Sequence, residues 1–64
     1  MFIVYTEIIA DNKISRWFYG MYKSGTHAND VATTLNRNEL ESNVYRCVCS
    51  YEDAINLNIM NMPC

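Results

Sequence analysis

The sequence predicts an α+β domain, in which a three-stranded antiparallel sheet carries two short helices on one face in the two-layer order β-β-α-β-α. Two segments rich in β-branched and aromatic residues flank a polar turn, as the strands of a hairpin do. A segment with apolar residues at helical spacing follows, and a third strand pattern then precedes a second helix. With 64 residues, the chain is expected to fold as one small domain, residues 1–64.

The hairpin is predicted from residues 2–10 and 14–22. The Asp-Asn pair at 11–12 is suited to the turn, because both residue types tolerate left-handed backbone angles. If these two residues form the loop, Glu7 lies directly opposite Arg16. An opposite-charge pair at that place favours this register.

The first helix is expected to begin at Ser24 or Thr26 and to end at Asn36 or Asn38, since asparagine accepts the left-handed conformation that ends many helices. Its apolar stripe consists of Ala28, Val31, Ala32 and Leu35.

A polar link, residues 39–42, leads to the third strand at 43–49. Ser50 is placed to cap the second helix, which is expected to cover roughly residues 50–59. The last four residues, 61–64, are expected to form a loose tail.

Alternation of side chains divides the hairpin into a face without charge and a face with the Glu7–Arg16 pair. We expect the helices to cover the first face. It comprises Phe2, Val4, Thr6, Ile8, Ala10, Ser15, Trp17, Tyr19 and Met21, with Cys47 and Cys49 from the third strand. The outer face then comprises Ile3, Tyr5, Glu7, Ile9, Ile14, Arg16, Phe18 and Tyr22, with Val44, Arg46 and Val48.

The outer face is expected to be a large apolar and aromatic surface with scattered charge. Monomers rarely expose such surfaces without a use for them, although single exposed apolar residues on a sheet are ordinary. Aromatic and arginine side chains dominate binding energies in protein interfaces. The predicted partner-binding residues are therefore Tyr5, Arg16, Phe18, Tyr22 and Arg46.

No catalytic or metal-binding motif accompanies this surface. Cys47 and Cys49 have Cys-x-Cys spacing on a strand, whereas zinc sites use loop spacings such as Cys-x2-Cys, so we interpret both as packed side chains. Cys64 and His27 do not complete a recognisable ligand set, and His27 with Asp30 lacks an activated nucleophile. We expect no enzymatic activity, no cofactor and no metal.

Composition adds three expectations. A net charge of −2 is too mild to indicate nucleic-acid binding by charge alone. An odd number of cysteines, three, is unlike a secreted disulfide framework, so we expect a cytoplasmic protein. No apolar run approaches the roughly 18 residues of a membrane helix, so we expect no membrane segment. Eight asparagines and two glycines suggest an AT-rich coding source such as a phage or a low-GC bacterium.

The expected function is therefore a small non-enzymatic module that binds a larger protein through the outer face, as phage accessory proteins do when they inhibit a host enzyme. Two alternatives use the same face. In one, the aromatic side chains stack on single-stranded nucleic acid. In the other, two outer faces meet in a structural homodimer.

Overall fold

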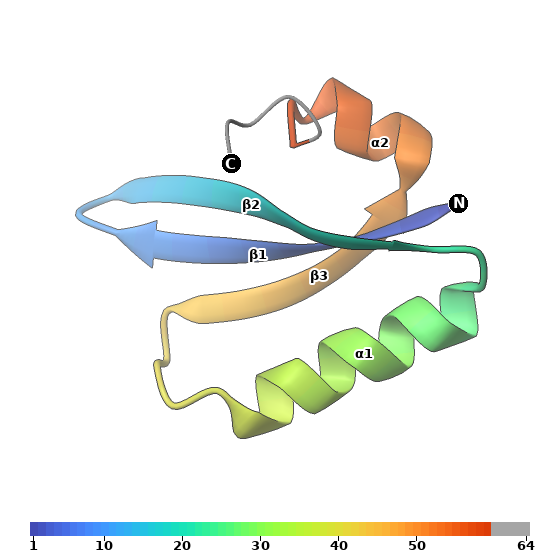
Figure 1. Ribbon diagram of the computed structural model, residues 1–64. Coiled ribbons are helices and arrows are strands. Elements are labelled where there is room, and N and C mark those ends of the chain that lie inside the picture. Colours follow the sequence, from blue (N-terminus) through green and yellow to red (C-terminus); the bar gives the residue numbers. More distant parts are fainter. Residues whose placement is uncertain (60–64) are drawn as a thin grey trace.

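The computed structural model describes residues 1–59, which form three strands and two helices in the predicted order (Figure 1). The elements are β1 (Phe2–Ala10), β2 (Lys13–Tyr22), α1 (Gly25–Asn38), β3 (Val44–Ser50) and α2 (Tyr51–Asn56). All neighbouring strands are antiparallel, and the sheet order is β2-β1-β3. The α+β class and the element order are confirmed. The predicted tail lies outside the described residues.

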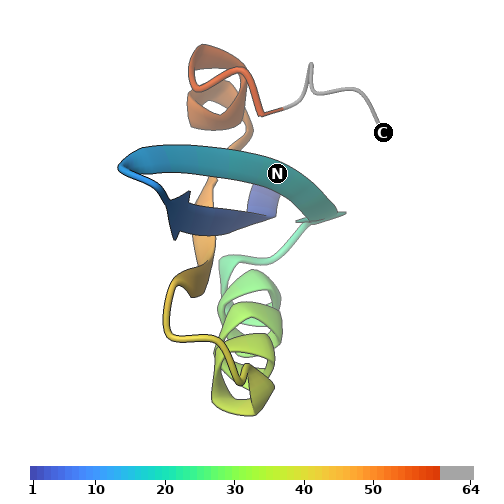
Figure 2. The same ribbon diagram turned by 90° about the vertical axis from the view of Figure 1, so that its left-hand side faces the viewer.

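The two helices lie on opposite faces of the sheet, so the prediction that both cover one face is wrong (Figures 1 and 2). On one side, which we call the α1 face, Val4 packs against Ala28 and Ala32. On the other side, the α2 face, Ile3 packs against Ala54. Ile3 and Val4 are adjacent in β1 and therefore point to opposite faces, yet both are fully buried. The central strand needs a cover on each side.

The hairpin has the predicted turn and register. Asp11 and Asn12 have φ values of 52° and 64°, the left-handed pair that a two-residue turn requires. Arg16 lies opposite Glu7, as the cross-strand charge pair predicted.

A β-bulge interrupts β2 beyond this point. Phe18 lies opposite Tyr5, but Gly20 lies opposite Val4, so Tyr19 is an extra residue without its own partner in β1. Side chains that follow the bulge therefore change faces relative to strict alternation.

The bulge exchanges the predicted positions of the last two residues of β2. Met21 is opposite Ile3 on the α2 face, and Tyr22 is opposite Phe2 on the α1 face. Both had been assigned to the other side, because the prediction counted residues in β2 without an interruption.

The third strand is also turned over relative to the prediction. Arg46 lies opposite Thr6 and faces the α1 side, whereas Cys47 lies opposite Tyr5 and faces the α2 side. The prediction had placed Arg46 outward with Tyr5 because a charged side chain usually avoids a covered face. Here Glu39 supplies an ion-pair partner for Arg46, so the arginine can lie beside α1.

Serine side chains begin both helices, as predicted. The Ser24 hydroxyl accepts a hydrogen bond from the His27 amide, and the Ser50 hydroxyl accepts one from the Asp53 amide. Each contact satisfies one of the amides that the first turn of a helix leaves without a partner.

Helix α2 is shorter than the ten residues expected for it. Asn58 adopts a left-handed conformation with φ of 60°, and the Ile59 amide donates to the Ala54 carbonyl. This is the six-to-one bond of a Schellman motif, which ends a helix. Its hydrophobic partner is Ile59, which is buried against the α2 face. An asparagine in the left-handed conformation therefore ends α2, whereas α1 continues past Asn36 and ends at Asn38.

Substitution of Ile3 by valine should measure how much burial of the central strand contributes to the free energy of unfolding. Removing one methylene from this fully buried side chain should lower the free energy of unfolding by about 1 kcal/mol. The same change at Ile14, which is 52% exposed, should alter it by less than about 0.5 kcal/mol. Urea denaturation of the two variants compares them, and equal destabilisation would contradict the assignment of the core.

Candidate functional site

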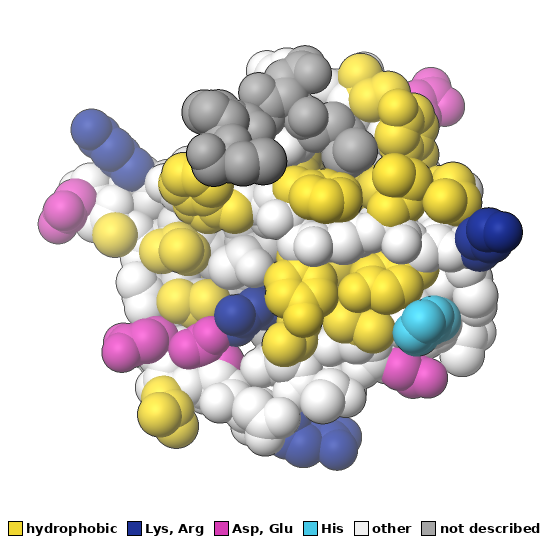
Figure 3. Space-filling model, viewed as in Figure 1, with side chains coloured by type: hydrophobic (Ala, Val, Ile, Leu, Met, Phe, Trp, Pro, Cys, Tyr) yellow, Lys and Arg dark blue, Asp and Glu magenta, His cyan; other side chains and the backbone are white. Residues whose placement is uncertain are grey.

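Strand β2 is the part of the sheet that the helices cover least. Apart from the half-buried Tyr22, its large hydrophobic side chains are all more than two-fifths exposed: Ile14 52%, Trp17 46%, Phe18 43%, Tyr19 49% and Met21 41%. In Figure 3, hydrophobic side chains gather above and below the course of β2. We call this set, together with Arg16 and the free edge of the strand, the β2 surface.

The helices leave β2 open because both are packed over the other two strands. The small side chains of Ala28 and Ala32 bring α1 close to Val4, with Val48 of β3 packed against the same cluster. On the opposite face, α2 packs over β1 and β3, through the cluster that includes Ile3, Ala54 and the β3 cysteines. Trp17 and Phe18 point to different faces, and each is more than two-fifths exposed.

A shallow pocket separates β2 from α1. It has a volume of about 300 Å³ and is lined by Tyr19, Asp30, Val31, Thr34 and Leu35. The pocket is mainly apolar and adjoins the side of β2 that carries Trp17. It could therefore hold an apolar side chain of a bound molecule.

Arg16 is held in place on the α2 face. Its Nε donates to Oε2 of Glu7 across the strand pair at 3.3 Å, and both side chains are partly exposed. An exposed pair of this kind adds little to stability, but it fixes where the guanidinium lies.

Tyr5 does not belong to an accessible surface. It is 9% exposed and lies in the cluster beneath α2, with Cys47 and Cys49 packed around it. Burial raises the pKa of its phenol to about 12, because the ionised form would lose hydration, and the neighbouring Cys47 acts in the same direction. Tyr5 is a core residue with its hydroxyl kept protonated.

Tyr22 is half-buried on the α1 face. Its ring meets the His27 ring edge to face, with centroids 4.8 Å apart. The ring also lies over Gly20, where an added Cβ would be 2.9 Å from the Tyr22 hydroxyl. Tyr22 therefore packs between the end of β2 and the start of α1, and the absence of a side chain at Gly20 leaves space for its ring.

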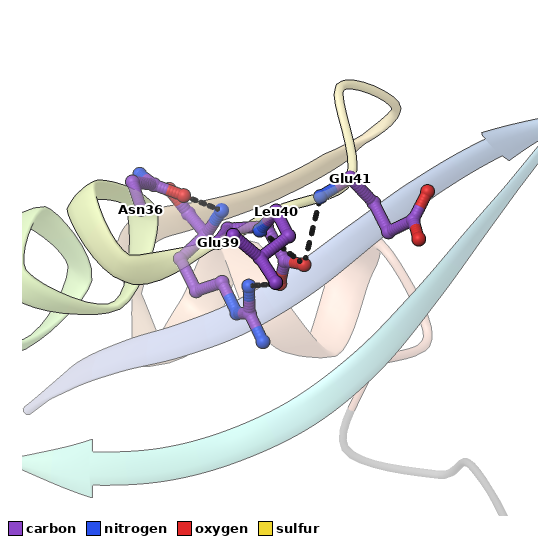
Figure 4. A network of polar contacts seen from close by, with 5 residues as sticks. Asn36, Glu39, Leu40 and Glu41 are labelled. Atoms are coloured by element: carbon purple, nitrogen blue, oxygen red, sulfur yellow. Dashed lines mark hydrogen bonds and ion pairs between the residues drawn. The ribbon is translucent and has the colours of Figure 1, made fainter.

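Arg46 lies on the other edge strand, β3, where it belongs to a polar network (Figure 4). Its side chain pairs with Glu39, whose second carboxylate oxygen accepts from the Leu40 and Glu41 amides. The hydrogen bond from Arg46 and those from the two amides hold the pKa of the Glu39 carboxyl below its usual range.

Asn36 completes this network by occupying the edge of β3. Its side-chain oxygen accepts from the Arg46 amide at 2.7 Å, and its side-chain nitrogen donates to the Arg46 carbonyl at 3.0 Å. These are the two bonds that a further strand would make at that residue, so Asn36 blocks the β3 edge at Arg46.

Of the five predicted binding residues, the structure brings only Arg16 and Phe18 together on the β2 surface. Tyr5 is in the core, Tyr22 is under α1, and Arg46 is on the opposite edge. The prediction missed three exposed side chains, Trp17, Tyr19 and Met21.

Gly20 was the signal that could have found Met21. A glycine inside a strand commonly marks a bulge or the close approach of another group. An interruption at that place would have separated Tyr22 from Phe18 and moved Met21 to the opposite face.

The cysteines of β3 are half-buried free thiols. Burial raises the pKa of both Cys47 and Cys49, which keeps them protonated and weakly nucleophilic. Residues 1–59 contain no group of three or more His, Cys, Asp or Glu side chains that could hold a metal ion. Cys64 lies outside the described residues.

Comparison of this chain with protein-family models, curated proteins and solved structures finds no match. Within residues 1–59, neither helix has the length and apolar character needed to cross a membrane.

Substitution of Asn36 by alanine should open the β3 edge. Loss of its two hydrogen bonds to Arg46 should lower the free energy of unfolding by about 1 kcal/mol. Asn38→Ala, in the same last turn of α1, is the matched control and should change stability by less than about 0.5 kcal/mol. Urea denaturation compares the variants, and an Asn36→Ala protein as stable as the control would contradict the role of this residue.

Alkaline titration should show Tyr5 ionising last. Because the folded-state pKa of Tyr5 is raised from 10.0 to about 12, its burial stabilises the fold below pH 10, and this contribution is lost as the pH rises between those values. Tyrosinate absorbance should show a final step near pH 12. The Tyr5→Phe variant should lack it, and persistence of the step there would disprove the assignment.

Proposed function

We propose that this chain is a small non-enzymatic protein-binding module, and that it attaches to a larger protein through the β2 surface. The observation that carries the proposal is the concentration of large, exposed hydrophobic side chains on one edge strand. Contiguous surfaces of this kind on small proteins mark interaction sites. Tryptophan, tyrosine and arginine, which are enriched among the residues that dominate interface energies, all occur on it.

The proposal differs from the sequence-based expectation in the surface used. That expectation placed five anchors on one face, and both alternatives, base stacking and dimerisation through outer faces, needed the same arrangement. The structure distributes these residues over both faces and into the core. Arg16 and Phe18 remain proposed binding residues, now with Trp17, Tyr19 and Met21.

Cellular location and biological effect are parts of the same proposal. The odd number of cysteines and the two free thiols of β3 support a reducing compartment, so we place the protein in the cytoplasm. Binding by such a module could inhibit the larger protein, as expected for an accessory protein of phage type. Activity of the isolated partner, measured with and without the module, tests that effect.

Replacement of either Trp17 or Phe18 by alanine should weaken partner binding. The native protein, used as bait in a lysate of its host, identifies candidate partners, and the affinity of each is then measured with purified components. Each substitution should weaken binding by about 2 kcal/mol, or roughly 30-fold in Kd, if the residue is a central anchor.

Tyr51→Ala is the matched control, because Tyr51 has the same 43% exposure as Phe18 but lies at the start of α2. It should leave the affinity unchanged. Circular dichroism confirms that each variant is folded. Equal affinity of the folded Trp17→Ala, Phe18→Ala and Tyr51→Ala proteins for the partner would refute the β2 surface as the binding site.

A further inference from the structure

The two edge strands of the sheet differ in whether their outward backbone groups have hydrogen-bond partners. At β3, the outward amide and carbonyl of Arg46 are taken up by the side chain of Asn36. At β2, the two-residue turn closes on a hydrogen-bonded pair, Ala10 and Lys13, and the direction of the backbone groups alternates from there. The N–H and C=O groups of alternate residues therefore point away from β1. These residues are Ile14, Arg16 and Phe18.

Within the described part of the chain, no side chain or backbone group hydrogen bonds to this outward row. The row is regular from the turn to the bulge at Tyr19. A strand edge of this kind is a template on which another extended segment can pair. The β3 edge is therefore occupied at Arg46, whereas the outward row of β2 is ready to accept a strand.

The basic residues of β2 indicate what kind of segment could pair with its open edge. The segment from Lys13 to Lys23 contains three of the five basic residues of the chain, the third being Arg16, and none of its seven acidic residues. Among residues 1–59, the Arg16 guanidinium hydrogen bonds only through Nε, to Glu7. Its terminal nitrogens are left for a second carboxylate, which arginine accepts in a fixed geometry.

We propose that β2 accepts an extended, acidic segment of a partner protein as a fourth strand of the sheet. This inference rests on the proposed function and specifies its mode. Main-chain hydrogen bonds to the outward row hold the segment, and alternate side chains select it. Carboxylates of the segment face Arg16 on the α2 face, and apolar side chains face Trp17 and the pocket beside Tyr19 on the α1 face.

A second copy of this chain fits the edge less well. Each copy would bring Lys13, Arg16 and Lys23 to the junction, without an acidic residue from the same segment to oppose them. Like charges set against each other at an interface disfavour that pairing. Sedimentation of the native protein tests this point, and a dimer at micromolar concentration that Trp17→Ala disrupts would overturn the choice of occupant.

Synthetic peptides test the mode directly. Three probes of about six residues, a usual strand length, are compared: alternating glutamate and valine, alternating lysine and valine, and the acidic peptide methylated at alternate backbone nitrogens. The only tryptophan of the chain, Trp17, lies on the binding strand and reports contact through its fluorescence. The acidic peptide should bind with Kd of about 1 mM or lower. The basic and methylated peptides should bind at least roughly tenfold more weakly.

A proline variant tests the same edge from the protein side. The Ile14 amide points away from β1, so Ile14→Pro removes an outward donor without breaking the hairpin ladder. It should weaken binding of the acidic peptide at least roughly tenfold more than Ile14→Ala, which truncates the same side chain but retains the amide. If the proline variant does not fold, the methylated peptide still decides the question.

Absence of binding by the acidic peptide overturns the inference, and so does equal binding of the acidic and basic peptides. Equal binding of the methylated peptide rejects strand addition. If any of these peptide results is found while partner binding still depends on Trp17 and Phe18, the β2 surface is the binding site but the partner does not bind it as an added acidic strand. If partner binding is independent of both residues, the proposed function itself fails.

Discussion

Burial of the central strand on both faces is the constraint on which the rest of this structure depends. Ile3 and Val4 are consecutive, fully buried and directed to opposite sides of the sheet. A single helical layer could cover only one of them. The chain therefore divides its limited helical material, 14 residues in α1 and six in α2, between two faces.

This division leaves too little helix to cover a third strand. The alanines of α1 and the Ala54–Ile59 end of α2 make compact contacts with β1 and β3. Small side chains allow close approach, but they do not extend sideways over Trp17 or Phe18. A domain of this size has a low ratio of buried to exposed surface, and β2 carries five exposed large hydrophobic side chains, more than any other element that the structure describes.

Local features of the fold were predictable from the sequence because neighbouring residues determine them. The Asp-Asn turn, the Glu7–Arg16 pairing and the serine caps each depend on a few adjacent side chains. The placement of the helices depends on tertiary packing. Its sequence signal was the unbroken apolar run at 2–5, since a strand covered on one face alternates and a strand covered on both does not.

The candidate site was only partly predictable for the same reason. Arg16 and Phe18 precede the bulge, so simple alternation placed them correctly relative to β1. Tyr22 follows the bulge, and one extra residue is sufficient to reverse its face. Arg46 was misplaced because its neutralising partner, Glu39, comes from the end of α1, and no local pattern connects the two.

The blocked position at Arg46 on β3 and the open edge of β2 are consequences of one packing arrangement. Packing α1 over β1 and β3 brings its last turn to the outer side of β3, where Asn36 can reach the backbone of Arg46. The same displacement takes the helix away from β2. If α1 were centred on the sheet, it would cover Trp17 but would carry Asn36 away from the β3 edge. Exposure of β2 therefore follows from how the two described helices cover this small core, and a partner strand that pairs with β2 would occupy the edge that they leave open.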